Sequence, residues 1–256
     1  MLTNSGTRPP IELTVPTELK PALPTGFARR AVHTLGRWIV NGRFTPDVVM
    51  PTELELATSL GVSRATVRDA VKVLSGKGLV RTARRYGTRV TPVEDWNLLD
   101  GDVIAWHEPD HPRMRRMFAE TTELRAIIEP SAAALAALRA TDDQRRGILS
   151  AAWAMHPESD GMQALFAADC RFHVTILEAT HNRVMRQMRQ MILTMLRVSY
   201  EYGVARPEND PVTREGHIIV AEAIACHDAE AARCAMAEML HRNESIAQDY
   251  WLQLSS

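Results

Sequence analysis

Residues 54–80, LELATSLGVSRATVRDAVKVLSGKGLV, place a short Gly-Val-Ser turn between two segments whose apolar residues recur at helical spacing. Pro51 and Thr52 precede the stretch and acids follow them, which is typical of a helix start. Gly61 predicts the end of this first helix, and Ser63 predicts the N-cap of the second. The stretch therefore predicts two helices joined by a tight turn.

The flanking sequence extends these two helices into a larger motif. Upstream, Val32, Leu35 and Ile39 lie near helical spacing and predict a helix over residues 27–41. Downstream, LVRTARRYGTRVTP alternates loosely around its central Tyr-Gly pair, which predicts a two-stranded hairpin. Three helices followed by a hairpin are typical of a winged helix-turn-helix, which we assign to residues 26–92.

Charge is distributed unevenly along a chain whose net charge is only −1. Residues 26–92 hold 12 Lys and Arg against four Asp and Glu, a net charge of +8. The first 25 residues balance at zero, so the chain after residue 92 carries −9. A basic segment joined to an acidic one predicts that the first binds a polyanion and the second does not.

Side chains suited to DNA recognition gather at the start of the second helix. Arg64, Thr66 and Arg68 lie in its first turn or so, the part of a recognition helix that inserts into the major groove. Arginine can pair bidentately with guanine, and threonine can contact a phosphate or a thymine methyl. The hairpin tip adds Arg85 and Gly87, and a glycine lets the backbone approach a groove or a phosphate. The alternative is a solvated basic face on a small helical domain.

The segment PTELELATSLGVSRATVRDAVKVLSGKGLVRTARRYGTRV resembles the DNA-binding domain of the GntR family of bacterial transcription regulators, over residues 27–91. The most specific parts are GVSRATVRDAVKVL, the GLV after that helix and GTRV in the hairpin. The resemblance implies DNA contacts at Ser63, Arg64, Thr66, Arg68 and Gly87. The family often has an arginine in the helix before the turn, where this chain has Leu54, so one DNA contact is expected to be missing.

The rest of the chain divides by composition. Residues 1–25 contain five prolines and little periodicity, so we expect a flexible N-terminal arm. Residues 93–112 predict a linker, which is too apolar for a free tether and is expected to dock on a domain. Residues 113–256 nearly lack strand signals, and short connections predict an antiparallel all-helical bundle, which makes the whole fold mainly α. Helices are expected at 113–128, 130–139, 142–155, 160–180, 183–202, 212–226 and 228–250.

Four polar side chains fall on apolar faces of the predicted bundle helices. Asp169 and His173 are four residues apart, which places both on one face of a helix. His217 and His241 share faces with apolar residues on two further helices. Buried carboxylate and imidazole groups cost on the order of several kcal/mol unless they are paired or ligated. A divalent Zn²⁺, Ni²⁺ or Mn²⁺ ion is one explanation, and hydrogen-bonded core histidines are the alternative.

Residues 113–250 resemble the all-helical C-terminal domain of the FadR subfamily, in its FCD branch, through ELRAIIEPSAAALAA, DCRFHVTILEATHN, EGHIIVAEAIACHDAEAA and MLH. The resemblance implies that a small organic acid binds beside a divalent metal held by Asp169, His173, His217 and His241. Arg125 matches a position often used near that pocket, and an i,i+4 pair with Glu129 is its alternative role. The linker phrase WNLLDGDVIAW resembles that of sugar-acid regulators, which implies an aldonate or similar effector.

Three classes of function fit these features. The first is a ligand-responsive transcription regulator, a repressor that binds a palindromic double-stranded DNA operator as a homodimer and is released by its effector. The second is a metal-dependent hydrolytic enzyme fused to a DNA-binding domain, although no acid–base residue stands next to the four candidate ligands. The third is an architectural DNA protein with a purely structural bundle. The sequence favours the regulator, with no catalytic residues.

The sequence also bears on the cellular location of the protein. No run of 18 apolar residues occurs, which argues against a membrane span, and the N-terminus lacks the basic-then-apolar pattern of a secretory signal. The three cysteines are scattered and form no CxxC pair, which is typical of a reducing compartment. We therefore expect a cytoplasmic location.

Overall fold

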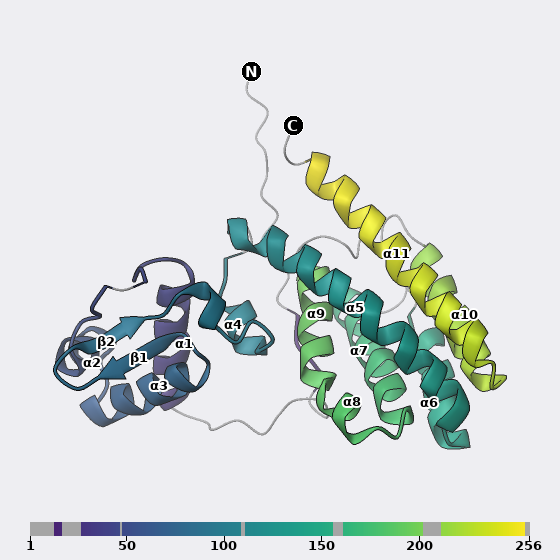
Figure 1. The fold of residues 1–256 in the computed structure, drawn as a ribbon, viewed down its shortest axis with the longest axis horizontal. Helices are drawn as coiled ribbons and strands as arrows, with labels where there is room; N and C mark the ends of the chain where they lie inside the picture. The colour runs from purple at the N-terminus through teal and green to yellow at the C-terminus, as the bar shows by residue number, and fades with distance from the viewer. Residues whose placement is uncertain are drawn as a thin grey trace. The chain divides into compact units, whose positions relative to one another are not determined.

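The computed structural model describes residues 13–16, 27–46, 48–108, 111–155, 161–201 and 211–253. The chain divides into two compact units: residues 21–111 form the smaller one, and residues 1–20 together with 112–256 form the larger one. Figure 1 shows helices throughout and a single labelled pair of strands, so the predicted mainly α fold is confirmed. Among the residues described, no helix is long and apolar enough to cross a membrane.

The smaller unit is a winged helix-turn-helix. It contains α1 (Phe27–Val40), α2 (Glu53–Leu60), α3 (Arg64–Gly76), β1 (Val80–Ala83) and β2 (Gly87–Val90). Apolar side chains from all three helices and from the hairpin form one core, in which Leu35, Val67, Leu74 and Leu79 are fully buried. The three-helix and hairpin arrangement predicted from the sequence is therefore confirmed.

Capping residues fix the ends of α2 and the start of α3. Thr52 and Glu55 form a capping box, in which the Glu55 carboxylate accepts from the Thr52 N–H at 2.7 Å. Gly61 ends α2 in the left-handed region, with φ +64°. The Ser63 hydroxyl then accepts from the Thr66 N–H at 3.0 Å and caps α3. These contacts are local in sequence, and they produce the tight turn that the sequence predicted.

The wing is an antiparallel pair in which Val80 is opposite Val90 and Ala83 is opposite Gly87. Arg85, in the tip between the strands, has φ +71°, and Gly87 follows with φ +75°. Both residues lie in the left-handed region, which glycine occupies at little cost and arginine does not. The tip is therefore a tight turn that carries an exposed arginine.

Residues 93–108 pack on the winged unit. They contain a 3₁₀ turn, η2 (Val93–Asp95), and a short helix, α4 (Gly101–Ala105). Trp106 is buried against α1, so closely that a Cβ on Gly36 would lie 2.3 Å from the indole ring. Lys77, at the end of α3, pairs with Asp100 at 2.6 Å. The apolar and acidic residues of this segment therefore make it part of the smaller unit.

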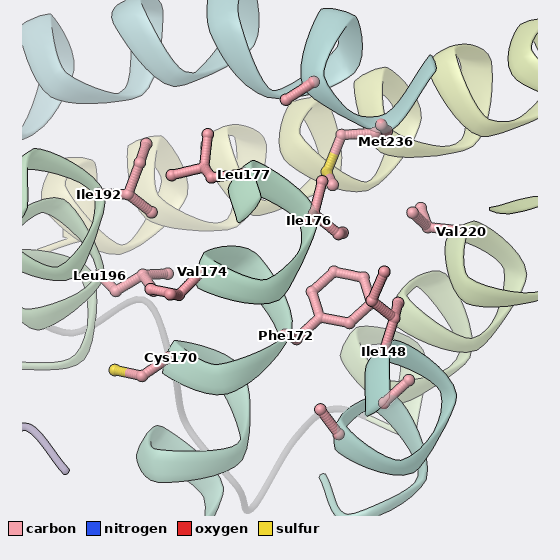
Figure 2. Packing of buried hydrophobic residues seen from close by; sticks show 14 of the residues in the cluster. Ile148, Cys170, Phe172, Val174, Ile176, Leu177, Ile192, Leu196, Val220 and Met236 are labelled. Carbon is pink, nitrogen blue, oxygen red and sulfur yellow. The ribbon is translucent and has the colours of Figure 1, made fainter. Parts of the chain in front are cut away.

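The larger unit is an all-helical bundle built around α7. It contains α5 (Pro112–Arg139), α6 (Asp142–Trp153), α7 (Gly161–Ala179), α8 (Arg183–Gln187), α9 (Arg189–Glu201), α10 (Pro211–Ala225) and α11 (Ala229–Gln253). α7 packs against α5, α6 and α9, and α10 packs against α6 and α11. Figure 2 shows the core, in which Phe172 and Ile176 of α7 lie among Ile148, Val220 and Met236 of neighbouring helices.

Two helix boundaries differ from those expected. α5 continues through Pro130, so the predicted break between 113–128 and 130–139 is wrong. Proline removes one backbone hydrogen bond, but Ala133 and Ala137 beyond it are fully buried, and that packing outweighs the local preference. The segment expected at 183–202 is divided at Met188 into α8 and α9.

Part of the expected N-terminal arm packs on the larger unit. Residues 1–12 and 17–25 of that arm lie outside the described residues, but Leu13 is only 3% exposed and joins the bundle core. The Gln163 side chain of α7 donates to the Thr14 carbonyl at 2.7 Å and accepts from the Thr14 N–H at 2.8 Å. These contacts anchor the segment near the start of α7.

Candidate metal centre and DNA-binding surface

One carboxylate and two imidazoles meet in the core of the larger unit. Asp169 and His173 lie one turn apart on α7, and His217 comes from α10. One ligand atom from each residue lies within 4.8 Å of the others. Asp169 Oδ1 is 3.1 Å from His173 Nε2 and 3.2 Å from His217 Nε2. All three side chains are buried, so the structure brings three of the four predicted metal ligands to one point.

Glu129 and Arg125 of α5 border this group. The Glu129 carboxylate accepts from the Arg125 Nε–H at 2.6 Å, and its other oxygen contacts His173 Nδ1. Arg125 Nη2 lies 3.5 Å from His173 Nε2. The i,i+4 pair considered for Arg125 is therefore formed, and the same side chain also lies beside the candidate ligands. Both roles weighed for Arg125 are compatible with its position.

Burial and opposite charges compete over the protonation of the group. Burial raises the pKa of Glu129, but Arg125 and His173 outweigh it and lower that pKa to about 2. Burial lowers the pKa of His173, whereas Glu129 and Asp169 raise it to about 9. Burial also raises the pKa of Asp169, which the two imidazoles pull well below its ordinary value. The charges thus compensate one another, as buried charges must.

The donor set fits a divalent transition-metal ion. Asp169 Oδ1 and the Nε2 atoms of His173 and His217 converge, and neutral imidazole with carboxylate suits ions such as Zn²⁺, Ni²⁺ and Mn²⁺. Glu129 contacts the other nitrogen of His173, an arrangement that orients a histidine ligand and fixes its tautomer. A hydrogen-bonded core histidine, the alternative from the sequence, has the same contacts, so metal binding remains a proposal.

His241 lies outside the three-residue group. It is exposed on α11, whose neighbouring residues Met239 and Leu240 are buried. Residues two apart on a helix point about 200° away from each other, so the face that carries Met239 cannot also carry His241. A Cβ on Gly216, the residue before His217, would lie 3.0 Å from Met239 Cγ. Met239 therefore occupies the part of α11 that is next to the group.

Two further side chains belong to the group, although the sequence did not single them out. Tyr200 of α9 is buried, and its hydroxyl forms a hydrogen bond with Asp169; burial and that carboxylate raise the pKa of Tyr200 well above its ordinary value. Glu129 was considered only as a partner for Arg125. No spacing signal links Tyr200 to Asp169, since they lie 31 residues apart on separate helices.

The predicted DNA-binding residues of α3 lie at its N-terminal end. Ser63, Arg64 and Arg68 are exposed, and Thr66 is half-buried. The Ser63 hydroxyl lies 2.8 Å from the Thr66 hydroxyl, so both side chains also serve the cap. Arg68 forms two hydrogen bonds with Glu53 of α2, a partner that the sequence did not indicate. The arrangement leaves a basic, exposed helix start suited to a DNA groove.

The wing presents the other two candidate residues. Arg85 and Gly87 are exposed at the tip, and Tyr86 between them is 69% exposed. β1 and β2 add Arg81 and Arg89, which are cross-strand partners. Like charges directly opposite each other destabilise a strand ladder, so this pairing does not serve folding stability. A bound polyanion would compensate the two positive charges.

Comparison with known proteins identifies both units. Residues 27–90 match the gntR family of bacterial regulatory proteins, and residues 120–242 match the FCD domain. The chain is 34% identical over 213 residues to the galactonate operon transcriptional repressor of Escherichia coli, with 82% of this chain and 92% of the relative covered. The chain belongs to the GntR family. The resemblance found in the sequence is therefore confirmed.

Other relatives of this GntR protein agree. A putative L-lactate dehydrogenase operon regulatory protein of Escherichia coli is 32% identical over 196 residues, with 73% of each chain covered. Among solved structures, Lar, which controls the expression of the Listeria monocytogenes agr system, has a TM-score of 0.60 at 18% identity, with 89% and 99% coverage. Escherichia coli McbR/YncC has a TM-score of 0.52 at 17% identity, with 89% and 100% coverage. These two structures support the fold.

The family decides between the classes of function left open by the sequence. GntR-family proteins are DNA-binding transcription regulators, so this chain is a transcription regulator and not an enzyme. The alternative of a metal-dependent hydrolase is thereby set aside. A merely architectural DNA protein does not fit either, because relatives that match most of this chain are named as operon regulators.

Proposed function

We propose that this GntR-family protein represses a sugar-acid catabolic operon in the cytoplasm and is released by a small organic acid bound beside a divalent metal. The observation that carries the proposal is the buried group of Asp169, His173 and His217, whose ligand atoms lie within 4.8 Å of one another. Relatives named for a galactonate operon and, putatively, for an L-lactate dehydrogenase operon support hydroxy acids as the class of effector.

In this proposal the winged unit reads the operator. Ser63, Arg64, Thr66 and Arg68 enter the major groove at the start of α3, where arginine recognises guanine edges. Arg85 and Gly87 follow the adjacent backbone or minor groove. A homodimer presents two copies of α3 to the two halves of a palindrome, because a two-fold axis in the protein matches one in the DNA.

The FCD domain supplies the sensor. Asp169, His173 and His217 would hold the metal, which supplies a Lewis-acidic position for a carboxylate or hydroxyl oxygen. Arg125 adds a second cationic contact for the acid, because a guanidinium carries five N–H donors and the bond from its Nε to Glu129 uses one. Burial excludes water, which strengthens each of these interactions.

Band-shift titration tests the proposal with the full chain. The duplex is first selected from a random library by binding to the purified protein, and it is then titrated in the presence of galactonate, lactate and acetate. We expect a hydroxy acid to weaken binding by about 5- to 150-fold, the usual range of allosteric coupling, and acetate to have little effect. No release by any hydroxy acid would contradict the effector half of the proposal. Elemental analysis of the same preparation tests the metal half.

A further inference from the structure

Glu53 on α2 holds an arginine of the recognition helix by two hydrogen bonds. Arg68 donates from Nε to Glu53 Oε1 at 3.0 Å and from Nη2 to Oε2 at 2.8 Å. Arg64 Nη2 lies 4.0 Å from the same carboxylate. The bond from Arg68 is the main cause of a lowered pKa at Glu53. The carboxylate therefore stays ionised between two arginines at the start of α3.

Capping does not explain this position of Glu53. The acid that completes the capping box of α2 is Glu55, which bonds Thr52, whereas Glu53 points its carboxylate across to α3. Packing does not explain it either, because the side chains of Glu53 and Arg68 are 34% and 56% exposed. An exposed ion pair of this kind contributes little to folding stability. Its two-point geometry instead restricts the orientation of the Arg68 guanidinium.

We propose that Glu53 is a specificity-determining, positioning residue that presents Arg68 to a guanine of the operator; this rests on the proposed role of α3 as the recognition helix. A guanidinium has five N–H donors, and Glu53 takes one from Nε and one from Nη2. Three donors remain on Nη1 and Nη2, at the end away from Glu53. Two of them suffice to bind guanine O6 and N7.

The same carboxylate opposes binding to DNA in general. It adds a negative charge to a surface that meets phosphates, and phosphate contacts supply most of the affinity for any sequence. Glu53 thus lowers affinity for all DNA while it fixes the arginine that discriminates between bases. Its removal should have two opposite effects, tighter non-specific binding and weaker discrimination, which a purely structural role would not produce.

The experiment compares Glu53→Gln, Glu53→Ala and Arg68→Ala in the full chain, on the duplex selected from a random library and on all its single-base-pair variants. A good bidentate arginine–guanine pair discriminates by about 5- to 150-fold, so we expect Arg68→Ala to lose that preference at one base pair in each half-site. We expect Glu53→Gln and Glu53→Ala to lose at least about fivefold at the same base pair while binding non-specific DNA more tightly. Adding Glu53→Gln to Arg68→Ala should cause no further loss.

Asp69→Asn is the matched control. It removes one exposed carboxylate from α3, where Asp69 pairs with Lys72 at 3.2 Å and acts on Arg68 through its charge. We expect it to tighten binding to all sequences and to keep the base preference. If Glu53→Gln behaves like Asp69→Asn, the positioning role is wrong. If Arg68→Ala leaves the base preference unchanged, the proposed recognition helix is wrong instead, so the two failures are distinguishable.

Discussion

Asp169 is the shared point of the buried group, because one of its oxygens lies within 3.2 Å of two imidazole nitrogens. One nitrogen belongs to His173 of α7 and the other to His217 of α10. The Asp169 carboxylate therefore links α7 to α10 by an electrostatic contact. The same oxygen would be the anionic ligand of a metal, and Glu129 would act on His173 from outside the ligand shell. Metal affinity should therefore depend on Asp169 more strongly than on any surrounding residue.

Asp169→Asn keeps the size of the side chain and removes its charge. We expect metal binding to weaken by more than about 100-fold, since even groups outside the ligand shell contribute about 10- to 100-fold. Competition with a chelator, followed by elemental analysis, measures the change, and urea unfolding of the full chain confirms that the larger unit, which carries Asp169, is folded. Unchanged metal content would exclude Asp169 as a ligand.

His241→Ala separates the ligand set implied by resemblance from the set that the structure brings together. His241 is exposed on α11, so we expect its removal to leave the metal content unchanged. His217→Ala is the matched comparison, because it removes an imidazole that lies 3.2 Å from Asp169. Equal loss of metal in the two variants would show that His241 is a ligand after all.

Among the helices and strands, the sequence best predicts those features that depend on residues close together in the chain. Thr52, Gly61 and Ser63 cap helices through contacts within three or four residues, and all three work as expected. The spacing of Asp169 and His173 likewise needs only one helix. Packing between residues far apart in the sequence decides how each helix is rotated and which residues of different helices meet.

Helix rotation and tertiary packing explain the features that the sequence did not predict. The apolar neighbours of His241 suggested a buried face, but the side of α11 that meets α10 carries Met239. Pro130 indicated a helix break, which packing of the following alanines prevents. Glu53 and Arg68 are 15 residues apart on two helices, so no pattern within either helix predicts their pairing.

The exposed Leu54 side chain of α2 leads to a testable expectation for DNA binding. The side chain is 59% exposed at the position where the family often has an arginine. We expect Leu54→Arg to tighten DNA binding and to steepen the dependence of log affinity on log salt by about 0.9, the value for one added phosphate contact. Leu54→Gln is the control, since it removes the same apolar surface without adding charge. Identical salt slopes for the two variants would place residue 54 away from the DNA.

The N-terminal segment around Leu13 leads to a testable expectation for the stability of the larger unit. Leu13 is 3% exposed in the bundle core, although its sequence context suggested a mobile arm. We expect Leu13→Ala to destabilise the larger unit by about 2–5 kcal/mol, as for other buried leucines. Thr14→Ala should have little effect, because the bonds to Gln163 use backbone atoms of Thr14. Urea unfolding of the full chain measures both, and equal midpoints would show that the segment does not contribute to the core.

In the proposed regulator, effector bound by the larger unit is coupled to DNA bound by the smaller unit, and such coupling must be reciprocal. If an effector weakens DNA binding by a given factor, about 5 to 150 in typical cases, DNA must weaken effector binding by the same factor. Calorimetric titration of the active hydroxy acid, with and without the selected duplex, measures the second factor. Arg68→Ala should weaken the effect of a given duplex concentration without changing effector affinity in the absence of DNA, because Arg68 belongs to the winged unit and the buried group belongs to the larger unit. An effector affinity that keeps falling as the duplex concentration rises, without reaching a plateau, would mean that the acid competes directly with DNA, and the proposed sensor would then be wrong.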